Sequence, residues 1–439
     1  MAEEKIVHIS INGKEYAVPA DWTIIQACQQ HGIEVPHYCY HEDLSVAGNC
    51  RMCLVKVAKI PKPVIACATP VSEGMEVDTA SEEVQGERRS VMEFLLINHP
   101  LDCPECDQAG ECRLQNYSYE YGRDHGRFEE NKVIRKKATF GPHVKYWGSR
   151  CIVCTRCTRV TDEVSGTGEL TVAYRGDRSE ISVFPGRVLD NPLSMNTVDI
   201  CPVGALVSSD FLYRQRVWEL KSADSICGGC SLGCNIRVDA NKQNEIKRIV
   251  PRRNNEVNKA WMCDHGRLDF PYAYENRLNL CVEDGRQIPW KDAYPKIADR
   301  LLRDNTVYLI SYWNSTETYE WLKAELGGLS GVRVAGYGKP VVDDMVFPGF
   351  TIFGDKNPNR EGFTQGFGDL IVPLESLGGE EEFSNVVVIS NVPNYEPAVE
   401  VVDVLNRAED LMVLDFWESP IVQHANVRMA VSTLTHFEK

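Results

Sequence analysis

Apolar and polar residues at the start of the chain follow the pattern of a β-hairpin and then of a helix. Apolar side chains occupy every second position of residues 6–11, which predicts a strand with one buried face. Asn12-Gly13 follows and favours a tight turn into a second strand. Asp21 or Thr23 can then cap a helix, because a side-chain oxygen there accepts from a free backbone N–H. These residues predict a small β-rich domain.

A second helix is predicted from Ser81 onward. Two glutamates occupy its first turn, where the helix dipole favours negative charge, and an apolar stripe follows. The helix has to stop near residue 98, because Pro100 forces His99 out of helical geometry. His99 is therefore expected in a loop.

The last third of the chain has a different pattern, in which strand-like and helical runs alternate. This alternation predicts an α/β domain. The predicted strands cover 307–311, 332–335, 386–390 and 411–415, and the predicted helices cover 316–326 and 398–407.

Charge and composition exclude several classes of function. The chain has 439 residues and a formal net charge of −16, so we expect no attraction to nucleic-acid phosphates. No positively charged leader opens the sequence, and its apolar runs are far shorter than the roughly 20 residues that span a bilayer. We expect a cytoplasmic protein that meets a membrane only through a partner.

Seventeen cysteines are more than packing requires, and a reduced cytosolic chain favours metal binding over disulfides. Fifteen of them and one histidine form four sets with ligand-like spacing. The sets are, first, Cys39, Cys50, Cys53 and Cys67; second, His99, Cys103, Cys106 and Cys112; third, Cys151, Cys154, Cys157 and Cys201; and fourth, Cys227, Cys230, Cys234 and Cys263. The remaining Cys28 and Cys281 are expected to be buried, apolar residues.

The first two sets predict different clusters. In the first set a Cys-x2-Cys turn and two flanking cysteines predict a [2Fe-2S] site, although plant-type ferredoxins have a shorter first gap. A zinc site or reduced buried thiols are the alternative. In the second set three cysteines cap three corners of a [4Fe-4S] cube, and the neutral imidazole of His99 takes the fourth.

The third and fourth sets each predict a [4Fe-4S] cluster. The third set has the Cys-x2-Cys-x2-Cys run and the Cys-Pro of bacterial ferredoxins. Arg150, Arg156 and Arg159 surround it, either offsetting the negative charge of the cluster or lying in solvent. In the fourth set Gly228-Gly229 and Gly233 allow backbone amides to approach the sulfurs, but a zinc ribbon has a similar spacing.

The sets occur in an order that resembles a known family. The runs NHPLDCPEC (98–106) and RCIVCTRC (150–157) closely resemble the large cluster-carrying peripheral-arm subunit of respiratory complex I, the G subunit of bacterial NADH:quinone oxidoreductase. The resemblance covers residues 1 to about 275. It implies one [2Fe-2S] and three [4Fe-4S] clusters in the four sets, of which the fourth lies off the main electron route.

The resemblance also implies the partners. These are an NADH-oxidising FMN flavoprotein subunit, a small [2Fe-2S] subunit, a quinone-side cluster subunit and, indirectly, the membrane arm. The chain has neither a Gly-x-Gly-x-x-Gly motif after a strand nor a P-loop, so we expect it to bind no NADH and no flavin itself. Electrons are expected to pass the third and second sets on their way to quinone, with the first set as an intermediate or a side store.

The expected fold class is α+β multidomain: an N-terminal β-grasp [2Fe-2S] ferredoxin domain, [4Fe-4S] ferredoxin-like segments and a C-terminal α/β domain. Beyond residue 275 the chain resembles the start of a molybdopterin oxidoreductase domain, for instance in the polar turn 355–359. About 160 residues are too few to enclose that cofactor, so we expect no molybdopterin. The predicted domains are 1–78, 79–139, 140–221, 222–278 and 279–439.

Two other functions compete with a complex I subunit. An electron-relay subunit of a cytosolic NAD-linked hydrogenase or formate dehydrogenase would share the first three sets. A zinc-stabilised scaffold without redox activity would be colourless, with zinc in place of iron and sulfide.

Overall fold

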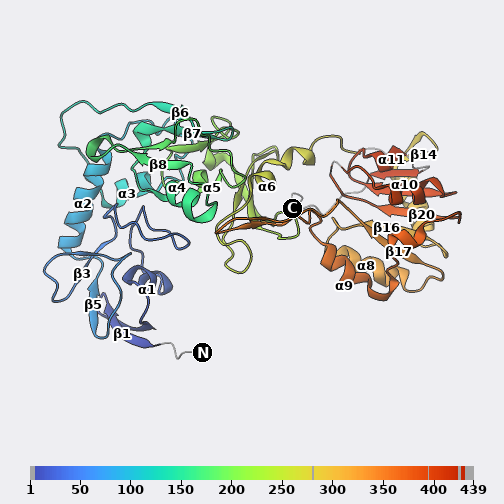
Figure 1. Ribbon diagram of the computed structural model, residues 1–439, viewed down its shortest axis with the longest axis horizontal. Helices are drawn as coiled ribbons and strands as arrows, with labels where there is room; N and C mark the ends of the chain where they lie inside the picture. The colour runs from blue at the N-terminus through green and yellow to red at the C-terminus, as the bar shows by residue number, and fades with distance from the viewer. Residues whose placement is uncertain (1–4, 279–280, 394, 424–426, 431–439) are drawn as a thin grey trace. The chain divides into compact units, whose positions relative to one another are not determined.

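The computed structural model describes residues 5–278, 281–393, 395–423 and 427–430. These residues form two compact units, whose helices and strands are drawn in Figure 1. Unit 1 comprises the described residues up to 221 together with 240–247 and 347–350, and unit 2 comprises the others. None of the helices in the described part of the chain has both the length and the apolar character of a membrane span.

Unit 1 begins with a five-stranded sheet in the order β2-β1-β5-β3-β4. β1 pairs with β2 in antiparallel fashion and with β5 in parallel fashion. The predicted first strand is confirmed, because Val7, Ile9 and Ile11 are buried on one of its faces. The strands are β1 (Ile6–Ile11), β2 (Lys14–Pro19), β3 (Leu54–Val57), β4 (Val64–Ile65) and β5 (Met75–Asp78).

The helix predicted between the strands is α1 (Ile24–Gln30). It starts after Thr23, whose backbone N–H donates to the Gln26 side chain at 2.8 Å, so Thr23 and not Asp21 is the cap. Cys28 on this helix is fully buried in the apolar core of the sheet, as predicted. Burial raises the pKa of the Cys28 thiol to about 11, which keeps it neutral.

The helix predicted after Ser81 is α2 (Glu82–Leu96), and it is followed by α3 (Arg113–Tyr121). Met92 of its apolar stripe is fully buried. Arg88 is also buried, which the hydrophobic pattern did not predict, and its guanidinium donates to the Leu54 carbonyl at 2.9 Å. This hydrogen bond ties α2 to β3.

The rest of unit 1 is built from short elements, so the low periodicity of this segment reflects small strands and single turns. β7 pairs with β6 and β10, and β8 pairs with β9. The elements are β6 (Lys137–Thr139), β7 (Val144–Trp147), α4 (Arg156–Arg159), a π-helical turn (Val160–Val164), β8 (Leu170–Ala173), β9 (Glu180–Val183), α5 (Asn196–Asp199) and β10 (Leu206–Ser208).

Unit 2 contains a three-stranded sheet, a short helix and a seven-stranded sheet. The small sheet has the order β11-β12-β13, and the large one has the order β15-β14-β22-β21-β20-β16-β17. The elements before the large sheet are β11 (Lys221–Ile226), β12 (Asn235–Ala240), β13 (Ile246–Pro251) and α6 (Asp264–Leu268).

Five neighbouring strands of the large sheet are parallel to one another: β22, β21, β20, β16 and β17. Those predicted at 307–311 and 411–415 have the predicted bounds, as does the helix at 316–326. The elements are β14 (Cys281–Glu283), β15 (Arg286–Ile288), α7 (Trp290–Leu301), β16 (Val307–Ser311), α8 (Thr316–Leu326), β17 (Arg333–Tyr337), the hairpin strands β18 (Met345–Val346) and β19 (Thr351–Ile352), α9 (Arg360–Phe367), β20 (Val386–Ile389), α10 (Val399–Asn406), β21 (Leu411–Asp415), α11 (Pro420–Gln423) and β22 (Val427–Ala430).

Helices cover both faces of this sheet and make three layers. Alternate residues of β16 face opposite ways: Leu309 packs in a core with α10 and α11, whereas Tyr308 packs in a core with α7, α8 and α9. Figure 1 shows α8 and α9 together on one side of the strands. Both faces are thus buried, as parallel strands require.

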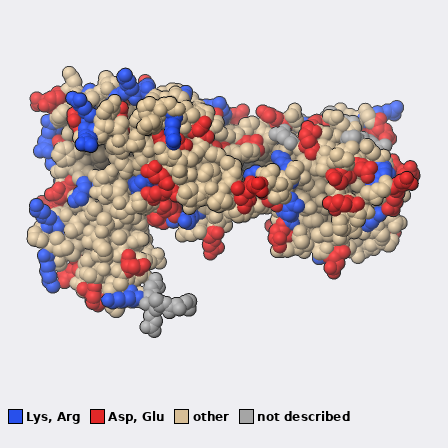
Figure 2. All heavy atoms as spheres, viewed as in Figure 1, with Lys and Arg blue, Asp and Glu red and all other residues tan. Residues whose placement is uncertain are grey.

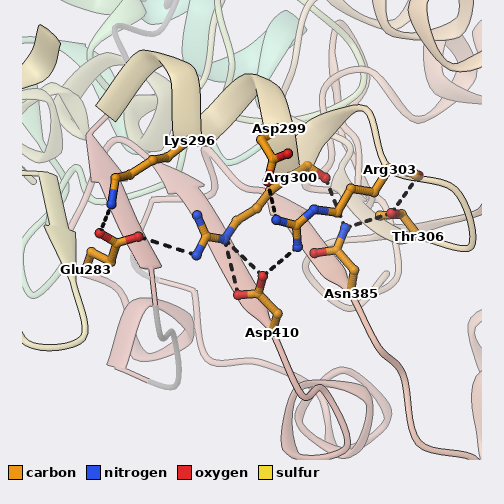
Figure 3. Close-up of polar contacts among 8 residues, drawn as sticks. All are labelled: Glu283, Lys296, Asp299, Arg300, Arg303, Thr306, Asn385 and Asp410. Atoms are coloured by element: carbon orange, nitrogen blue, oxygen red, sulfur yellow. Dashed lines mark hydrogen bonds and ion pairs between the residues drawn. The ribbon is translucent and has the colours of Figure 1, made fainter. Parts of the chain in front are cut away.

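An ion-pair network fixes α7 to the ends of several strands of this sheet (Figure 3). Arg300 pairs with Asp410 at 3.0 Å and with Glu283 at 3.4 Å, and Arg303 pairs with Asp410 at 2.9 Å. Asn385 donates to the backbone carbonyl of Arg300 at 3.0 Å. The network therefore links α7 to the residues just before β20 and β21.

Charged side chains are mixed over both units on the face that Figure 2 shows, with Lys and Arg scattered among Asp and Glu. Neither sign of charge is gathered at one place on this face.

Candidate metal centres

The four cysteines of the first set come together in unit 1. Cys39 and Cys50 lie in the loop between α1 and β3, Cys53 precedes β3, and Cys67 follows β4. The Cys39 amide donates to the Cys50 sulfur at 3.5 Å. Hydrogen bonds from the Cys50 and Cys67 thiols lower the pKa of Cys39, and one from Cys67 lowers that of Cys53. The four sulfurs therefore converge on one point.

The second set surrounds a surface hollow at the end of α2. His99, Cys103 and Cys112 line this hollow, whose volume is about 480 Å³. Cys106 is buried beside it, close enough to Cys103 and Cys112 to interact with both. Burial and, to a smaller extent, the nearby cations Arg150 and Lys132 lower the pKa of His99 to about 4, so the imidazole is neutral. A neutral imidazole is the form that binds a metal.

All four cysteines of the third set line one small pocket, whose volume is about 20 Å³. Burial raises the pKa of Cys151, Cys154 and Cys201 to about 11. Val153 and Thr155, on either side of Cys154, have φ angles of 50° and 62°. β-branched residues rarely adopt this left-handed conformation, and strained positions of this kind concentrate at functional sites.

The fourth set lies in unit 2, with three cysteines in the loop before β12 and Cys263 at the start of α6. The Gly229 amide approaches the Cys227 sulfur at 3.4 Å, which agrees with the role predicted for the glycines of this loop. The Gly266 amide donates to the Cys263 sulfur at 3.3 Å. Gly266 also faces Cys227, because a Cβ there would lie 2.8 Å from that sulfur.

Residues 201–204 connect the second and third sets. Cys201 belongs to the third set, while the Cys112 sulfur of the second set lies 3.8 Å from the carbonyl of Pro202. Two residues further on, Gly204 packs directly against the Cys106 sulfur. One four-residue segment therefore contacts both sets.

Tyr38 lies between the first and second sets. It is fully buried, and its hydroxyl donates to the Met92 sulfur at 3.1 Å. Burial raises its pKa, and the neighbouring Cys112 and Cys50 thiols raise it further. Tyr38, the residue before Cys39, therefore lies close to sulfurs of both sets.

The three arginines near the third set are buried, so the interpretation that they lie in solvent is wrong. Arg150, Arg156 and Arg159 are 1%, 5% and 7% exposed. Arg150 is closer to the second set than the spacing suggested: it pairs with Asp102 at 3.0 Å and lowers the pKa of His99. Burial raises the pKa of Cys154 in the third set, and the charges of Arg156 and Arg159 partly offset this rise.

The polar turn predicted at residues 355–359 lies next to the fourth set. The Ser231 amide, within the cysteine loop, donates to the Asp355 carbonyl at 2.9 Å. Burial raises the pKa of Cys263, and the charge of nearby Lys356 partly offsets this rise. The turn is polar, as predicted, and it also supports the cysteine loop.

Four family models match parts of the chain, and each describes an iron–sulfur region. They are the 2Fe-2S iron-sulfur cluster binding domain over residues 4–82, the NADH-ubiquinone oxidoreductase-G iron-sulfur binding region over 88–127, the ferredoxin-like domain of NADH-quinone oxidoreductase subunit 3 over 141–207, and the NDSU1/NuoG-like 4Fe-4S domain of NADH-ubiquinone oxidoreductase over 220–271. Each matched region contains one of the four ligand sets.

Curated relatives agree with these matches. The G subunit of NADH-quinone oxidoreductase from Rickettsia felis is 44% identical over 300 residues, which are 67% of this chain and 45% of that protein. The NADH-ubiquinone oxidoreductase 75 kDa subunit of Reclinomonas americana is 45% identical over 300 residues, 67% of this chain and 43% of that protein. The chain resembles the G subunit of NADH-quinone oxidoreductase. This finding confirms the resemblance predicted from the cysteine spacing.

The likeness to the G subunit covers part of the relatives, since the chain spans less than half the length of the curated proteins named above. The N-terminal part of this chain carries 2Fe-2S and 4Fe-4S ferredoxin-like domains. Among solved structures, a chain of an NAD+-reducing [NiFe]-hydrogenase in its H2-reduced state is 26% identical with a TM-score of 0.45, over 48% of this chain and 91% of that chain.

The residues present fit iron–sulfur clusters. Each set offers three or four thiols, of which at least two are buried, and thiolate donors select iron–sulfur clusters or zinc. Gly204 and Gly266 leave room beside the sulfurs that a Cβ would fill. Among the described residues, no group of three or more His, Cys, Asp or Glu side chains is arranged around a single metal ion.

Several residues next to the sets were not predicted from the sequence. They are Arg88, Gly204, Gly266 and Lys356, which come from segments far from the cysteines they approach. Only Gly204 carried a signal, because it follows the Cys-Pro pair by two residues.

Proposed function

We propose that this chain is an electron-transfer subunit of an NADH:quinone oxidoreductase, which relays electrons from an NADH-oxidising flavoprotein toward quinone. The observation that carries this proposal is the joining of three ligand sets within unit 1 by residues 201–204, Tyr38 and Arg159. Iron–sulfur clusters bound there would supply reversible one-electron exchange. No other chemistry is assigned to the chain, which acts as an enzyme only as part of the complex.

The proposed ligands are the four sets themselves. The first set would hold one [2Fe-2S] cluster, and the second, third and fourth sets would each hold a [4Fe-4S] cluster. The convergence of the first set and the shared pocket of the third support these assignments. His99 is supported by its place in the hollow beside Cys103 and Cys112 and by its neutral imidazole.

The contacts between the sets support a path for electrons. Residues 201–204 touch both the third and the second set, which favours direct exchange between them. We propose that electrons leave unit 1 from the second set, which opens to the surface at His99 and Cys103. The first set serves as an intermediate or a side store, and the fourth lies off this path.

The family likeness supports a finer description of the fold and the partners. The mixed sheet of β1 to β5 packed with α1 supports a β-grasp ferredoxin fold for residues 1–78. The other proposed divisions are 79–139, 140–221, 222–278 and 279–439. The proposed partners are an FMN-containing flavoprotein subunit, a small [2Fe-2S] subunit and a quinone-side cluster subunit, on the cytoplasmic side of a membrane.

Iron and acid-labile sulfide analysis of anaerobically purified protein, with electron paramagnetic resonance after dithionite reduction, tests this function. About 14 irons per chain are expected from one [2Fe-2S] and three [4Fe-4S] clusters. A colourless protein that contains zinc and no sulfide would contradict the proposal. Purification with a hydrogenase in place of quinone-side subunits would keep the clusters and reject the complex.

A further inference from the structure

Arg156 and Arg159 are buried cations that have no acidic partner. They are 5% and 7% exposed, and in the described part of the chain neither forms an ion pair with a carboxylate. The Nε atom of Arg156 is buried without any hydrogen-bond partner. Burying an uncompensated charge is costly, so the fold requires negative charge near these two side chains.

Arg159 touches the backbone of two different ligand sets. Its Nη2 donates to the carbonyl of Cys39, in the first set, at 2.5 Å and lies 3.4 Å from the carbonyl of Cys154, in the third set. Its Nη1 donates to the carbonyl of Ser45, in the loop that carries Cys50. One guanidinium therefore fixes the cysteine loops of both sets.

Arg156 makes the same kind of connection two positions along the chain from Cys154. Its guanidinium donates to the carbonyl of Tyr40, next to Cys39, and to the carbonyl of Ile200, next to Cys201, the latter at 3.3 Å. Its charge interacts with the Cys154 and Cys39 sulfurs. Both arginines thus join the same two sets, and both use backbone carbonyls alone.

We propose that Arg156 and Arg159 are shared counter-cations of the first and third clusters, which hold the two sites together and raise the reduction potentials of both. The inference rests on the cluster assignments proposed above. A cluster held by four thiolates is an anion and gains one more negative charge on reduction. A nearby buried cation therefore stabilises the reduced form more than the oxidised form.

Arg88 differs from this pair in one useful respect. It is also buried, and its charge interacts with Cys53 of the first set. Its one hydrogen bond among the described residues goes to the Leu54 carbonyl, and its guanidinium lies over the Tyr121 ring. No hydrogen bond of Arg88 reaches the described residues of the third set. Its loss is expected to change the potential of the first cluster alone.

The test is a redox titration, followed by electron paramagnetic resonance, of the full chain with Arg159→Gln, Arg156→Gln and the matching lysine variants. Each glutamine variant is expected to disfavour reduction of both clusters on the order of tenfold, which is about 59 mV for one electron. The lysine variants keep the charge and are expected to stay close to the parent potentials. Arg88→Gln is expected to lower only the first potential.

Arg407→Gln is the control for losing a half-buried arginine that donates to backbone carbonyls. Arg407 donates to the carbonyls of Leu377 and Glu381 in unit 2 and pairs with Asp403. This variant is expected to leave the reduction potentials of the first and third clusters unchanged. Glutamine variants that load clusters but leave one or both potentials unchanged would overturn the inference. If a glutamine variant binds no cluster but the matching lysine variant does, the inference is supported. If neither variant binds a cluster, the inference is overturned. A parent protein without iron or signals would instead reject the proposed function.

Discussion

Gly204 packs directly against the sulfur of Cys106, although 98 positions of the printed sequence separate them. A Cβ at Gly204 would overlap this sulfur and would lie 3.1 Å from the Cβ of Gln108. A methyl group here would therefore push Cys106 out of the second set.

Gly204→Ala is expected to abolish the second cluster, because no space remains for both the methyl group and the sulfur. Iron analysis should fall from about 14 to about 10 per chain, with loss of one [4Fe-4S] resonance signal. Gly86→Ala is the matched control: a Cβ at Gly86 meets nothing within 4 Å, and alanine in a helix is worth up to ~1 kcal/mol over glycine. An alanine variant at 204 with full iron content and parent spectra would show that Gly204 does not confine the site.

His99→Cys tests the imidazole in the second set. Replacing a neutral ligand by a thiolate adds one negative charge, so the reduction potential of this cluster is expected to fall and its spectrum to change. The measurement is a redox titration followed by electron paramagnetic resonance. His143→Cys is the control, because His143 contacts Asp210 at 3.5 Å and belongs to no set. An unchanged spectrum and potential in His99→Cys would mean that another group is the fourth ligand.

The periodic part of the fold was predictable because each element there buries a face of its own. β16, β21 and α8 have the bounds predicted from sequence, and all five residues of β16 are buried. β3 and β5 were missed, because they are four residues long and become strands only through pairing with each other and with β1. Local periodicity carries no information about such pairing.

α7 was missed for a different reason. Pro295 lies inside this helix, and proline usually ends one. The ion pairs of Arg300 and Arg303 with Asp410 hold the helix in place. Sequence reading cannot anticipate support from a residue more than a hundred positions away.

The sequence grouped the site residues into sets, but not the residues around them. Cys-x2-Cys spacing is a local feature, so the four sets were visible in the sequence. The approach of Arg159 to Cys39 spans 120 positions and depends on how the domain of β1 to β5 packs against α4. For the same reason the sequence left the exposure of Arg156 and Arg159 undecided.

Gly266→Ala is expected to disrupt the fourth set while leaving unit 1 intact. The added Cβ would lie 2.8 Å from the Cys227 sulfur and 3.5 Å from the Cys263 sulfur. Iron should fall from about 14 to about 10 per chain, with the signals of the other three clusters unchanged. Cys227→Ser is expected to give the same loss. Full iron content in both variants would exclude a cluster at the fourth set.

Asp410→Ala is expected to destabilise the large sheet of unit 2 by about 1–2 kcal/mol, because it leaves two arginines without their shared carboxylate. The loss of stability is small because the Asp410 and Arg303 side chains are partly exposed, at 25% and 37%, and water screens such ion pairs. Urea unfolding monitored by tryptophan fluorescence measures the change, and added salt should reduce the difference between variant and parent. Glu325→Ala, at an exposed position of α8, is the control and is expected to change the unfolding free energy by less than about 0.5 kcal/mol. Equal stability of Asp410→Ala and parent at low salt would mean that the ion pairs of Asp410 do not help to hold α7 against the sheet.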